Sequence, residues 1–131
     1  MLKNAYLEIA ERSIKSGEAS LNAGIHEKAG FLLYHAFESS GGAYCSSKGE
    51  TYPYSHQKKI NMFVSSSRGE RYSIHASQLA VELKSLRNLL LYPDETPHGH
   101  ISLPKNQITP DQTKRLLGRV SSLIKRIKLQ I

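Results

Sequence analysis

The chain has 131 residues, enough for one domain that buries roughly two thirds of the surface its unfolded form would expose. Hydrophobic residues make up 39% and charged residues 22%, which excludes a disordered tail. No apolar run reaches the roughly 18 residues that a membrane span needs, and Glu8 and Glu11 stand where a secretory signal would be apolar. The single cysteine, Cys45, excludes an internal disulfide and a four-cysteine zinc site, so we expect a cytoplasmic protein that does not contact a membrane.

The positive charge lies mainly in the second half of the chain. Residues 1–65 carry seven basic and six acidic side chains, whereas residues 66–131 carry eleven basic and five acidic ones. The last nineteen residues hold six basic side chains and no acidic one. A basic field of this kind attracts phosphate backbones, acidic proteins or anionic membranes, and charge alone does not choose among them.

Two long helices are expected first, over residues 3–22 and 25–46, because apolar and small residues recur there at helical spacing. The second helix contains Gly41-Gly42, which costs about 2 kcal/mol relative to two alanines. Either the helix ends near Ser40, or the glycines allow another element to approach closely. We favour close packing.

Pro53 makes residues 48–55 a loop, and Ser55 is suited to cap a short helix over 56–64. After a second loop, an apolar stripe predicts a long helix over 70–92 that Pro93 ends.

Residues 94–107 hold two prolines and one glycine and are expected to form a long connection. Thr109-Pro110-Asp111 then begins the last helix, whose apolar stripe runs to Ile131. No segment is typical of a strand. We therefore predict an all-α, up-and-down bundle of four long helices plus a short extra helix, forming a single domain over 1–131.

Several short motifs resemble those of HEPN domains ("higher eukaryotes and prokaryotes nucleotide-binding"), and the likeness spans roughly residues 5–128. In that family an Ala-rich helix with an aromatic and a His-Ala pair precedes a Tyr-Pro-x-x-His loop, and a later helix ends in Arg-x-x-x-Tyr-Pro-Asp type motifs. The matching residues here are Tyr34-His35-Ala36, Tyr52-Pro53-Tyr54-Ser55-His56, and Arg87 with Tyr92, Pro93 and Asp94.

This resemblance implies a helical bundle, often a homodimer, encoded beside a small nucleotidyltransferase or in a defence or toxin–antitoxin locus. One branch of the family consists of metal-independent ribonucleases with an Arg-x(4–6)-His motif. Another branch lacks that pair and binds nucleotides or partner proteins.

Arg87-Asn88 resembles the start of the nuclease motif, but Tyr92 stands in the place of the histidine. Metal-free RNA cleavage needs a base for the 2′-hydroxyl proton and a cation for the charge on the phosphate. Tyrosine is a poor base at neutral pH because its ordinary pKa is about 10. His98 and His100 lie beyond the permitted spacing, although their loop could bring one of them back. For Arg87 two interpretations stay open, a ligand contact and an ion pair with Asp94 or Glu95.

The remaining histidines are expected to be structural. We expect His35 in the core or an interface, and His56 to hold its loop against the bundle through a backbone hydrogen bond, with ligand contact as the alternative. Arg68 and His75 match the nuclease spacing formally, but they stand at the start of their helix, so Arg68 is interpreted as a loop charge and His75 as an exposed or half-buried residue. His98-Gly99-His100 is interpreted as a solvated loop, since zinc sites need three or four ligands on rigid elements. No metal and no cofactor are therefore predicted.

The last helix carries its basic residues opposite its apolar stripe, as any solvated amphipathic helix does, but without acidic partners. Arg115, Arg119 and Arg126 are therefore candidates for contact with a phosphate backbone. No aromatic side chain lies among them, so Tyr52, Tyr54 and Tyr92 are better candidates for base stacking.

Three functions follow as hypotheses. The first is a HEPN-like protein that binds a nucleotide, RNA or a partner nucleotidyltransferase, as part of a toxin–antitoxin or defence module. Its candidate site residues are His56, Arg87, Asn88, Tyr92, Arg115, Arg119 and Arg126. The alternative is a metal-independent ribonuclease toxin in which Arg87 is catalytic and a loop histidine is the base. A third hypothesis is a helical interaction module without a ligand.

Overall fold

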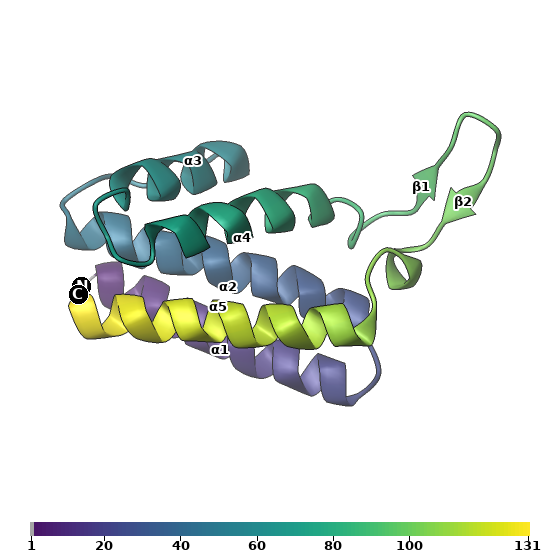
Figure 1. Cartoon of the computed structure of the whole chain (residues 1–131), viewed down its shortest axis with the longest axis horizontal. Helices are drawn as coiled ribbons and strands as arrows, with labels where there is room; N and C mark the ends of the chain where they lie inside the picture. Colours follow the sequence, from purple (N-terminus) through teal and green to yellow (C-terminus); the bar gives the residue numbers. More distant parts are fainter. Residues whose placement is uncertain (1) are drawn as a thin grey trace.

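A computed structural model describes residues 2–131, and within them it shows five α-helices, two very short strands and one 3-10 turn (Figure 1). In chain order these are α1 (Leu2–Asn22), α2 (His26–Ser47), α3 (His56–Ser66), α4 (Ser73–Leu86), β1 (Asp94–Glu95), β2 (Ile101–Ser102), η1 (Pro104–Asn106) and α5 (Pro110–Gln130). The predicted all-α class is confirmed, with four longer helices and the short α3 as the extra one.

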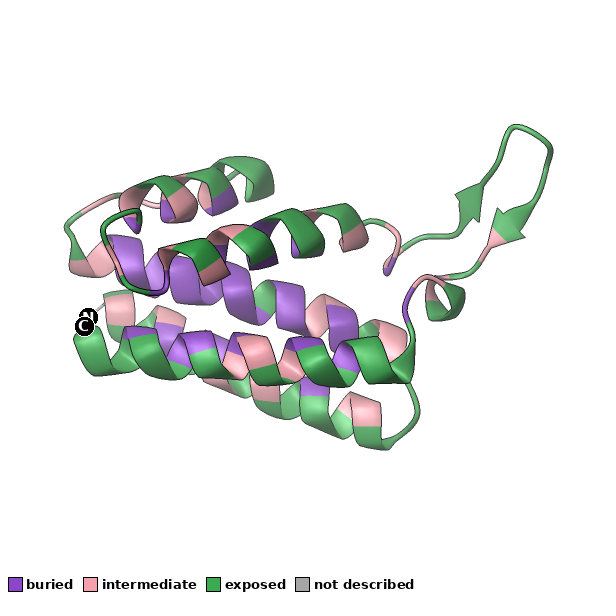
Figure 2. Ribbon diagram, viewed as in Figure 1, coloured by how far each residue is buried: buried purple, intermediate pink, exposed green. Residues whose placement is uncertain are grey.

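Helix α2 lies at the centre of the bundle, between the α1–α5 pair and the α3–α4 pair (Figure 1). Most of α2 is buried, whereas the other helices keep a broad exposed face (Figure 2). Its small residues Ala29, Ala36 and Ala43 are almost fully buried, which allows neighbouring helices to approach. His35 is exposed, so the expected place in the core is wrong, while the alternative of an interface residue stays a prediction.

The glycine pair lies inside α2, where both glycines contact aromatic rings. A Cβ atom on Gly41 would lie 2.7 Å from the Tyr52 hydroxyl and 2.8 Å from the Phe63 ring, and one on Gly42 would lie 2.8 Å from the Tyr6 ring. The helix continues to Ser47. The prediction of close packing is therefore confirmed, and the alternative of a helix end near Ser40 is wrong.

The predicted caps of α3 and α5 are present. The Ser55 hydroxyl accepts a hydrogen bond from the backbone N–H of Lys58, at 3.4 Å. Thr109 and Gln112 bond each other's backbone N–H groups in a capping box, with Pro110 in the first turn of α5. Both helices therefore begin where local side-chain chemistry satisfies their first N–H groups.

Helix α4 is shorter than the predicted 70–92 at both ends. At its start Tyr72 turns into the core, where it is 4% exposed. At its end the chain continues beyond Leu86 as hydrogen-bonded turns, in which Leu90 is fully buried against Gly30. The prediction failed because tertiary packing of Tyr72 and Leu90 overrides a continuous helical pattern.

The connection over 94–107 contains regular structure that the sequence pattern does not indicate. Asp94 pairs with Ser102 and Glu95 with Ile101 in an antiparallel two-stranded hairpin, and η1 follows. Gly99 turns the chain at the tip with a φ of 79°. The expectation of no strand is thus wrong for these four residues.

Hydrogen bonds join the C-terminal end of α5 to the loop before α4. The Tyr44 hydroxyl donates to the Glu70 carboxylate at 2.8 Å, and the Gln130 side-chain amide donates to the same carboxylate. The Tyr72 hydroxyl donates to Gln130 at 2.7 Å. The bonds from Gln130 and Tyr44 lower the pKa of Glu70 below its ordinary value of 4.5, because they favour the ionised form.

We expect the hydrogen bonds to the Glu70 carboxylate to weaken in acid. A carboxyl whose pKa is lower in the folded chain stabilises the fold above its ordinary pKa, and that stability is lost as pH falls through the folded value. Glu70→Gln should therefore unfold more easily than the wild type at pH 7, and the difference should shrink as pH falls below 4.5 and through the lowered pKa of Glu70. Urea denaturation at several pH values measures this, and a difference that stays constant over that range would contradict it.

Among residues 2–131, no helix combines the length and the apolar character that crossing a membrane requires.

Candidate functional site

Glu38 of α2 is the acidic side chain that the bundle buries most deeply. The residue is only 4% exposed and lies among the small and apolar residues of α2. A carboxylate in such a place is costly unless charged or hydrogen-bonded groups surround it. The side chains that contact Glu38 therefore form a polar site that hydrophobic packing does not explain.

Three side chains from α2 and α3 meet the Glu38 carboxylate. The Tyr34 hydroxyl, one helical turn before it, donates to Oε2 at 2.8 Å. His56 Nδ1 lies 2.8 Å from the same oxygen, and Lys59 Nζ lies 3.5 Å from Oε1. Because α3 carries His56 and Lys59 nearly one turn apart, both reach the same carboxylate.

The pairing with Glu38 determines which nitrogen of His56 is free. A carboxylate oxygen only accepts hydrogen bonds, so Nδ1 must carry the proton. In neutral His56 the lone pair is then on Nε2, and half of the side chain is exposed. His56 thus joins a buried carboxylate on one side to solvent on the other, the arrangement in which a histidine can accept a proton or bind a ligand.

Arg87 approaches the same group from the end of α4. Its guanidinium lies over the Tyr34 ring, 5.6 Å from the centroid, and its Nη1 donates to the Asn88 side chain at 3.0 Å. Its Nε atom is buried and has no hydrogen-bond partner within residues 2–131. We call Tyr34, Glu38, His56, Lys59 and Arg87 the Glu38 cluster.

Tyr34 connects the carboxylate to the guanidinium and stays protonated. Burial raises the pKa of Tyr34 well above its ordinary value, the hydrogen bond to Glu38 raises it further, and Arg87 acts in the opposite direction. The hydroxyl therefore remains a donor to Glu38 at any pH of interest, while its ring supports Arg87.

The loop before α3 is hydrogen-bonded to the cluster. The Tyr52 hydroxyl donates to the Glu38 backbone carbonyl at 2.8 Å, and the Tyr52 ring contacts Tyr6 edge-on. His56 does hold this loop, but through the Glu38 carboxylate and not through the predicted backbone hydrogen bond. The expectation failed because sequence spacing gave no sign that a carboxylate 18 residues earlier lies opposite His56.

The structure brings His56, Arg87 and Asn88 together but leaves the other candidates apart. Tyr92 is 62% exposed, and Tyr54 is fully exposed. Within the described residues, Arg87 makes no ion pair with Asp94 or Glu95, which corrects the structural interpretation of that side chain.

The arginines of α5 form a separate basic surface beside α4. Arg119 donates to Glu82 at 2.7 Å, while Arg115 and Arg126 are exposed. His75 of α4 is half-buried as predicted, and burial followed by the charges of Arg119 and Arg126 lowers the pKa of His75. These arginines therefore lie along α4 and α5 and do not enter the Glu38 cluster.

Sequence reasoning missed Glu38, Lys59 and Tyr34 as members of the site. The available signal was Glu38 itself, a lone acid within an α2 run of apolar and small residues. Acids are rarely buried without a partner, so an acid in that position indicates one.

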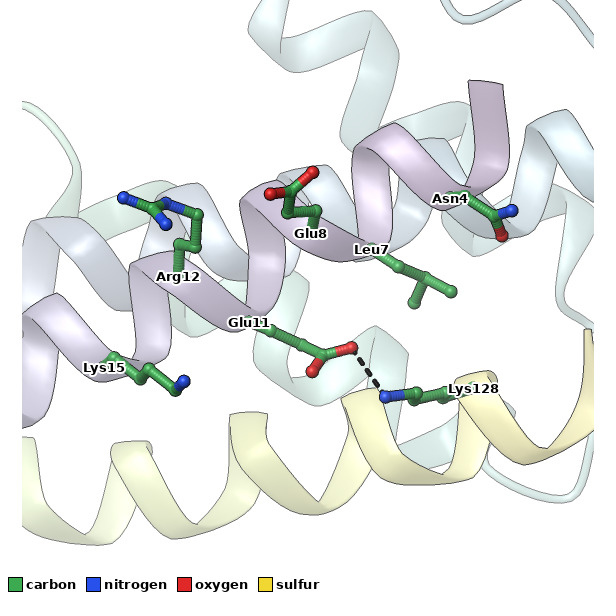
Figure 3. A pocket seen from close by; sticks show the side chains of 7 residues that line it. All are labelled: Asn4, Leu7, Glu8, Glu11, Arg12, Lys15 and Lys128. Atoms are coloured by element: carbon green, nitrogen blue, oxygen red, sulfur yellow. Dashed lines mark ion pairs between the residues drawn. The ribbon is translucent and has the colours of Figure 1, made fainter. Parts of the chain in front are cut away.

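A hollow lies between α1 and α5, away from the Glu38 cluster, and Figure 3 shows its lining. It holds about 430 Å³ and is spanned by an ion pair of 2.9 Å between Glu11 and Lys128. Most of its lining side chains are exposed, acids and bases alternate, and none belongs to the Glu38 cluster. It offers no concentrated charge to a ligand.

Metal ligation finds no support in the part of the chain that the structure covers. Residues 2–131 contain no group of three or more His, Cys, Asp or Glu side chains placed to hold a metal ion. Cys45 is buried, and burial raises the pKa of its thiol to about 11, which makes it a poor ligand and nucleophile.

Comparison with known proteins gives one match. The family model of the HEPN domain matches residues 4–130, which is nearly the whole chain. No curated protein and no solved structure matches the chain.

Proposed function

This chain belongs to the HEPN domain family, and from that premise we propose that the Glu38 cluster binds the phosphate group of a nucleotide or of RNA. The observation that carries the proposal is that His56 and Lys59 contact the buried Glu38 carboxylate, while the Arg87 guanidinium lies over the ring of Tyr34, whose hydroxyl is bonded to that carboxylate. With His56 neutral, Arg87 and Lys59 give two positive charges against one negative charge on Glu38. The cluster thus keeps an excess positive charge for an anion.

Arg87 is the proposed main phosphate ligand. A guanidinium has five N–H donors, and the one donated bond of Arg87 goes to Asn88. Its planar fork matches two phosphate oxygens at once. The guanidinium already packs against the face of the Tyr34 ring, so little Arg87 side-chain entropy would be lost when a phosphate binds.

The basic surface of α5 favours a polyanion over a mononucleotide. Arg115 and Arg126 are exposed and make no ion pair within residues 2–131. Their field would raise the local concentration of RNA and speed its approach. Tyr92, at the end of the turns after Arg87, is the proposed stacking residue for a base.

The test is a thermal-shift and calorimetry series with ATP, AMP, adenosine and a short single-stranded RNA. Phosphate recognition predicts a rise in melting temperature with ATP and RNA and none with adenosine, because a ligand stabilises the state that binds it. An equal response to adenosine and AMP, or no response to any phosphate-bearing ligand, would sink the proposal.

The HEPN resemblance also supports a protein partner, a nucleotidyltransferase in a toxin–antitoxin or defence module. Such a partner would bring a nucleotide to the Glu38 cluster. Co-expression of the chain with a small nucleotidyltransferase, if its gene neighbourhood encodes one, followed by size-exclusion chromatography, tests this part separately.

A second candidate function is metal-independent RNA cleavage, which the Glu38–His56 pair favours. Glu38 orients His56 so that Nε2 can take the proton of a 2′-hydroxyl. The 2′-oxygen then attacks phosphorus and the bond to the 5′-oxygen breaks, giving a 2′,3′-cyclic phosphate and a 5′-hydroxyl that takes its proton from solvent water, while Arg87 stabilises the charge on the phosphate. His56 would thus supply the base that the Tyr92 position lacks.

We expect wild type to cleave single-stranded RNA in EDTA if this second function holds, and His56→Ala to lose at least about 100-fold in rate, the usual contribution of a general base. A denaturing gel of labelled RNA measures this, with an all-deoxy strand of the same sequence as the uncleavable control. Intact RNA with wild type would exclude cleavage and leave the binding proposal untouched.

A further inference from the structure

The hydrogen bond between Arg87 and Asn88 fixes the orientation of the Asn88 amide. Arg87 Nη1 donates to Asn88 Oδ1 at 3.0 Å. A guanidinium carries only donors, so the amide atom that faces it must be the oxygen and not the nitrogen. The Nδ2 amino group therefore lies at the other end of the amide, and within residues 2–131 it has no hydrogen-bond partner. Because Asn88 is exposed, these two N–H donors are available to a ligand.

Tyr92 follows Asn88 by one helical turn. Its backbone N–H donates to the Asn88 carbonyl at 3.1 Å, which is the i to i+4 bond of a single α-turn. Residues four apart in such a turn have neighbouring side chains, with about 5–6 Å between their Cβ atoms. The Tyr92 side chain is 62% exposed. A base that stacks on the Tyr92 ring would therefore have one edge within reach of the Asn88 amide.

The charge of Arg87 determines which hydrogen bonds Asn88 offers to that edge. Hydrogen bonds polarise one another, so an amide oxygen that already accepts from a cation is a weaker acceptor for a second donor, while the amide N–H groups become stronger donors. The guanidinium also repels the positive N–H groups of a base and attracts its carbonyl oxygens. Asn88 beside Arg87 therefore acts as a donor to a base and not as a donor–acceptor pair.

The four bases differ in what they present to such a donor. On corresponding edges guanine has the acceptors O6 and N7 and uracil has O4, whereas adenine and cytosine carry amino groups in the same places. An asparagine that reads adenine uses both its amide oxygen and its amide nitrogen. With Oδ1 held by Arg87, contact between Asn88 Nδ2 and an amino group would bring two donors together.

We propose that Asn88 makes the nucleotide site at the Glu38 cluster selective for bases with a keto group, guanine and uracil, over their amino counterparts, adenine and cytosine. This inference rests on the proposed function, since it requires a phosphate bound by Arg87. Arg87 would hold the phosphate, Tyr92 would stack on the face of the base, and Asn88 Nδ2 would donate to its keto oxygen. Asn88 is thus a specificity-determining residue for the base.

Isothermal titration with GTP against ATP, and with UTP against CTP, tests the proposal. Within each pair the ring size and the phosphates are the same. We expect the wild type to bind the keto member about three- to tenfold more tightly, which corresponds to one neutral hydrogen bond. Asn88→Asp should invert both ratios, because a carboxylate only accepts hydrogen bonds, although its charge weakens binding of all four nucleotides. Asn88→Ala should bring both ratios close to one.

The matched control is Asn4→Asp, which makes the same chemical change on α1, in the hollow between α1 and α5 (Figure 3). Both asparagines are exposed, so neither substitution should disturb the core, and circular dichroism checks that each variant is folded. Asn4→Asp should keep both ratios of the wild type.

The possible failures are distinguishable. If the wild type binds both members of each pair equally and Arg87→Ala still weakens binding, the phosphate site stands and the base selection by Asn88 is wrong. A keto preference that survives Asn88→Asp, or one that Asn4→Asp also removes, would likewise overturn the inference. If the wild type binds none of the four nucleotides, the proposed phosphate site is wrong and the base selection fails with it.

Discussion

Replacing Arg87 by alanine is expected to weaken binding of ATP or short RNA by about 10- to 100-fold while the protein remains folded. A hydrogen bond to a charged group contributes about 1.5–3 kcal/mol, and each 1.4 kcal/mol is a factor of ten in affinity. Arg87 lies at the C-terminal end of α4, where its side chain contacts Tyr34 and Asn88 and is not part of the main core. Isothermal titration of both proteins with the same ligand measures the difference.

Two variants make the result specific to this guanidinium. Arg87→Lys keeps the charge but loses the planar fork, so it should recover only part of the affinity. Arg115→Ala removes an exposed cation from α5 and changes the net charge by the same amount as Arg87→Ala. It should change ATP affinity by less than about threefold, since exposed charges interact weakly through water. Equal losses of ATP affinity for Arg87→Ala and Arg115→Ala would show that only the overall electrostatic field of the protein matters. That result would contradict a phosphate site at the Glu38 cluster.

Gly41→Ala is expected to destabilise the fold by about 1–3 kcal/mol, whereas Gly118→Ala should stabilise it by up to about 1 kcal/mol. Alanine is the better helix former at both positions, which lie inside α2 and α5. At Gly41 the new methyl group would lie 2.8 and 2.9 Å from Phe63 atoms, and that ring is fully buried. A Cβ atom on Gly118 would have no atom within 4 Å apart from its chain neighbours and the nearby backbone of its own helix. The same substitution thus has opposite signs because of packing alone.

Urea denaturation of the two variants and the wild type measures both effects with one method. An unchanged denaturant dependence would show that the substitutions act on the native state and not on the compactness of the unfolded chain. If Gly41→Ala were as stable as Gly118→Ala, the close contact of α2 with α3 would be absent. The placement of His56 and Lys59 beside Glu38, which depends on that contact, would then be contradicted.

The helices could be predicted in large part because their signals are local. Ser55 and Thr109 cap the turns that follow them, and the apolar stripe of α5 has one period throughout. The same local rules failed for residues 70–72 and 87–92, where Tyr72 and Leu90 leave the helix to fill the core. A helical pattern tells which residues can form a helix, but packing decides where it stops.

The family could also be identified from the sequence, and the match over residues 4–130 confirms it. Arg87, Asn88 and His56 were found through their motifs, without knowledge of what surrounds them. The sequence by itself determined an all-α bundle, the starts of α3 and α5, and the family. The tertiary structure alone decided that α3 lies beside Glu38, so that Tyr34, His56, Lys59 and Arg87 gather around one buried carboxylate. The physical reason is distance along the chain. Residues 18 to 49 positions from Glu38 have no local interaction with it, so only the packing of whole helices places His56 and Lys59 against its carboxylate and Arg87 over the Tyr34 ring.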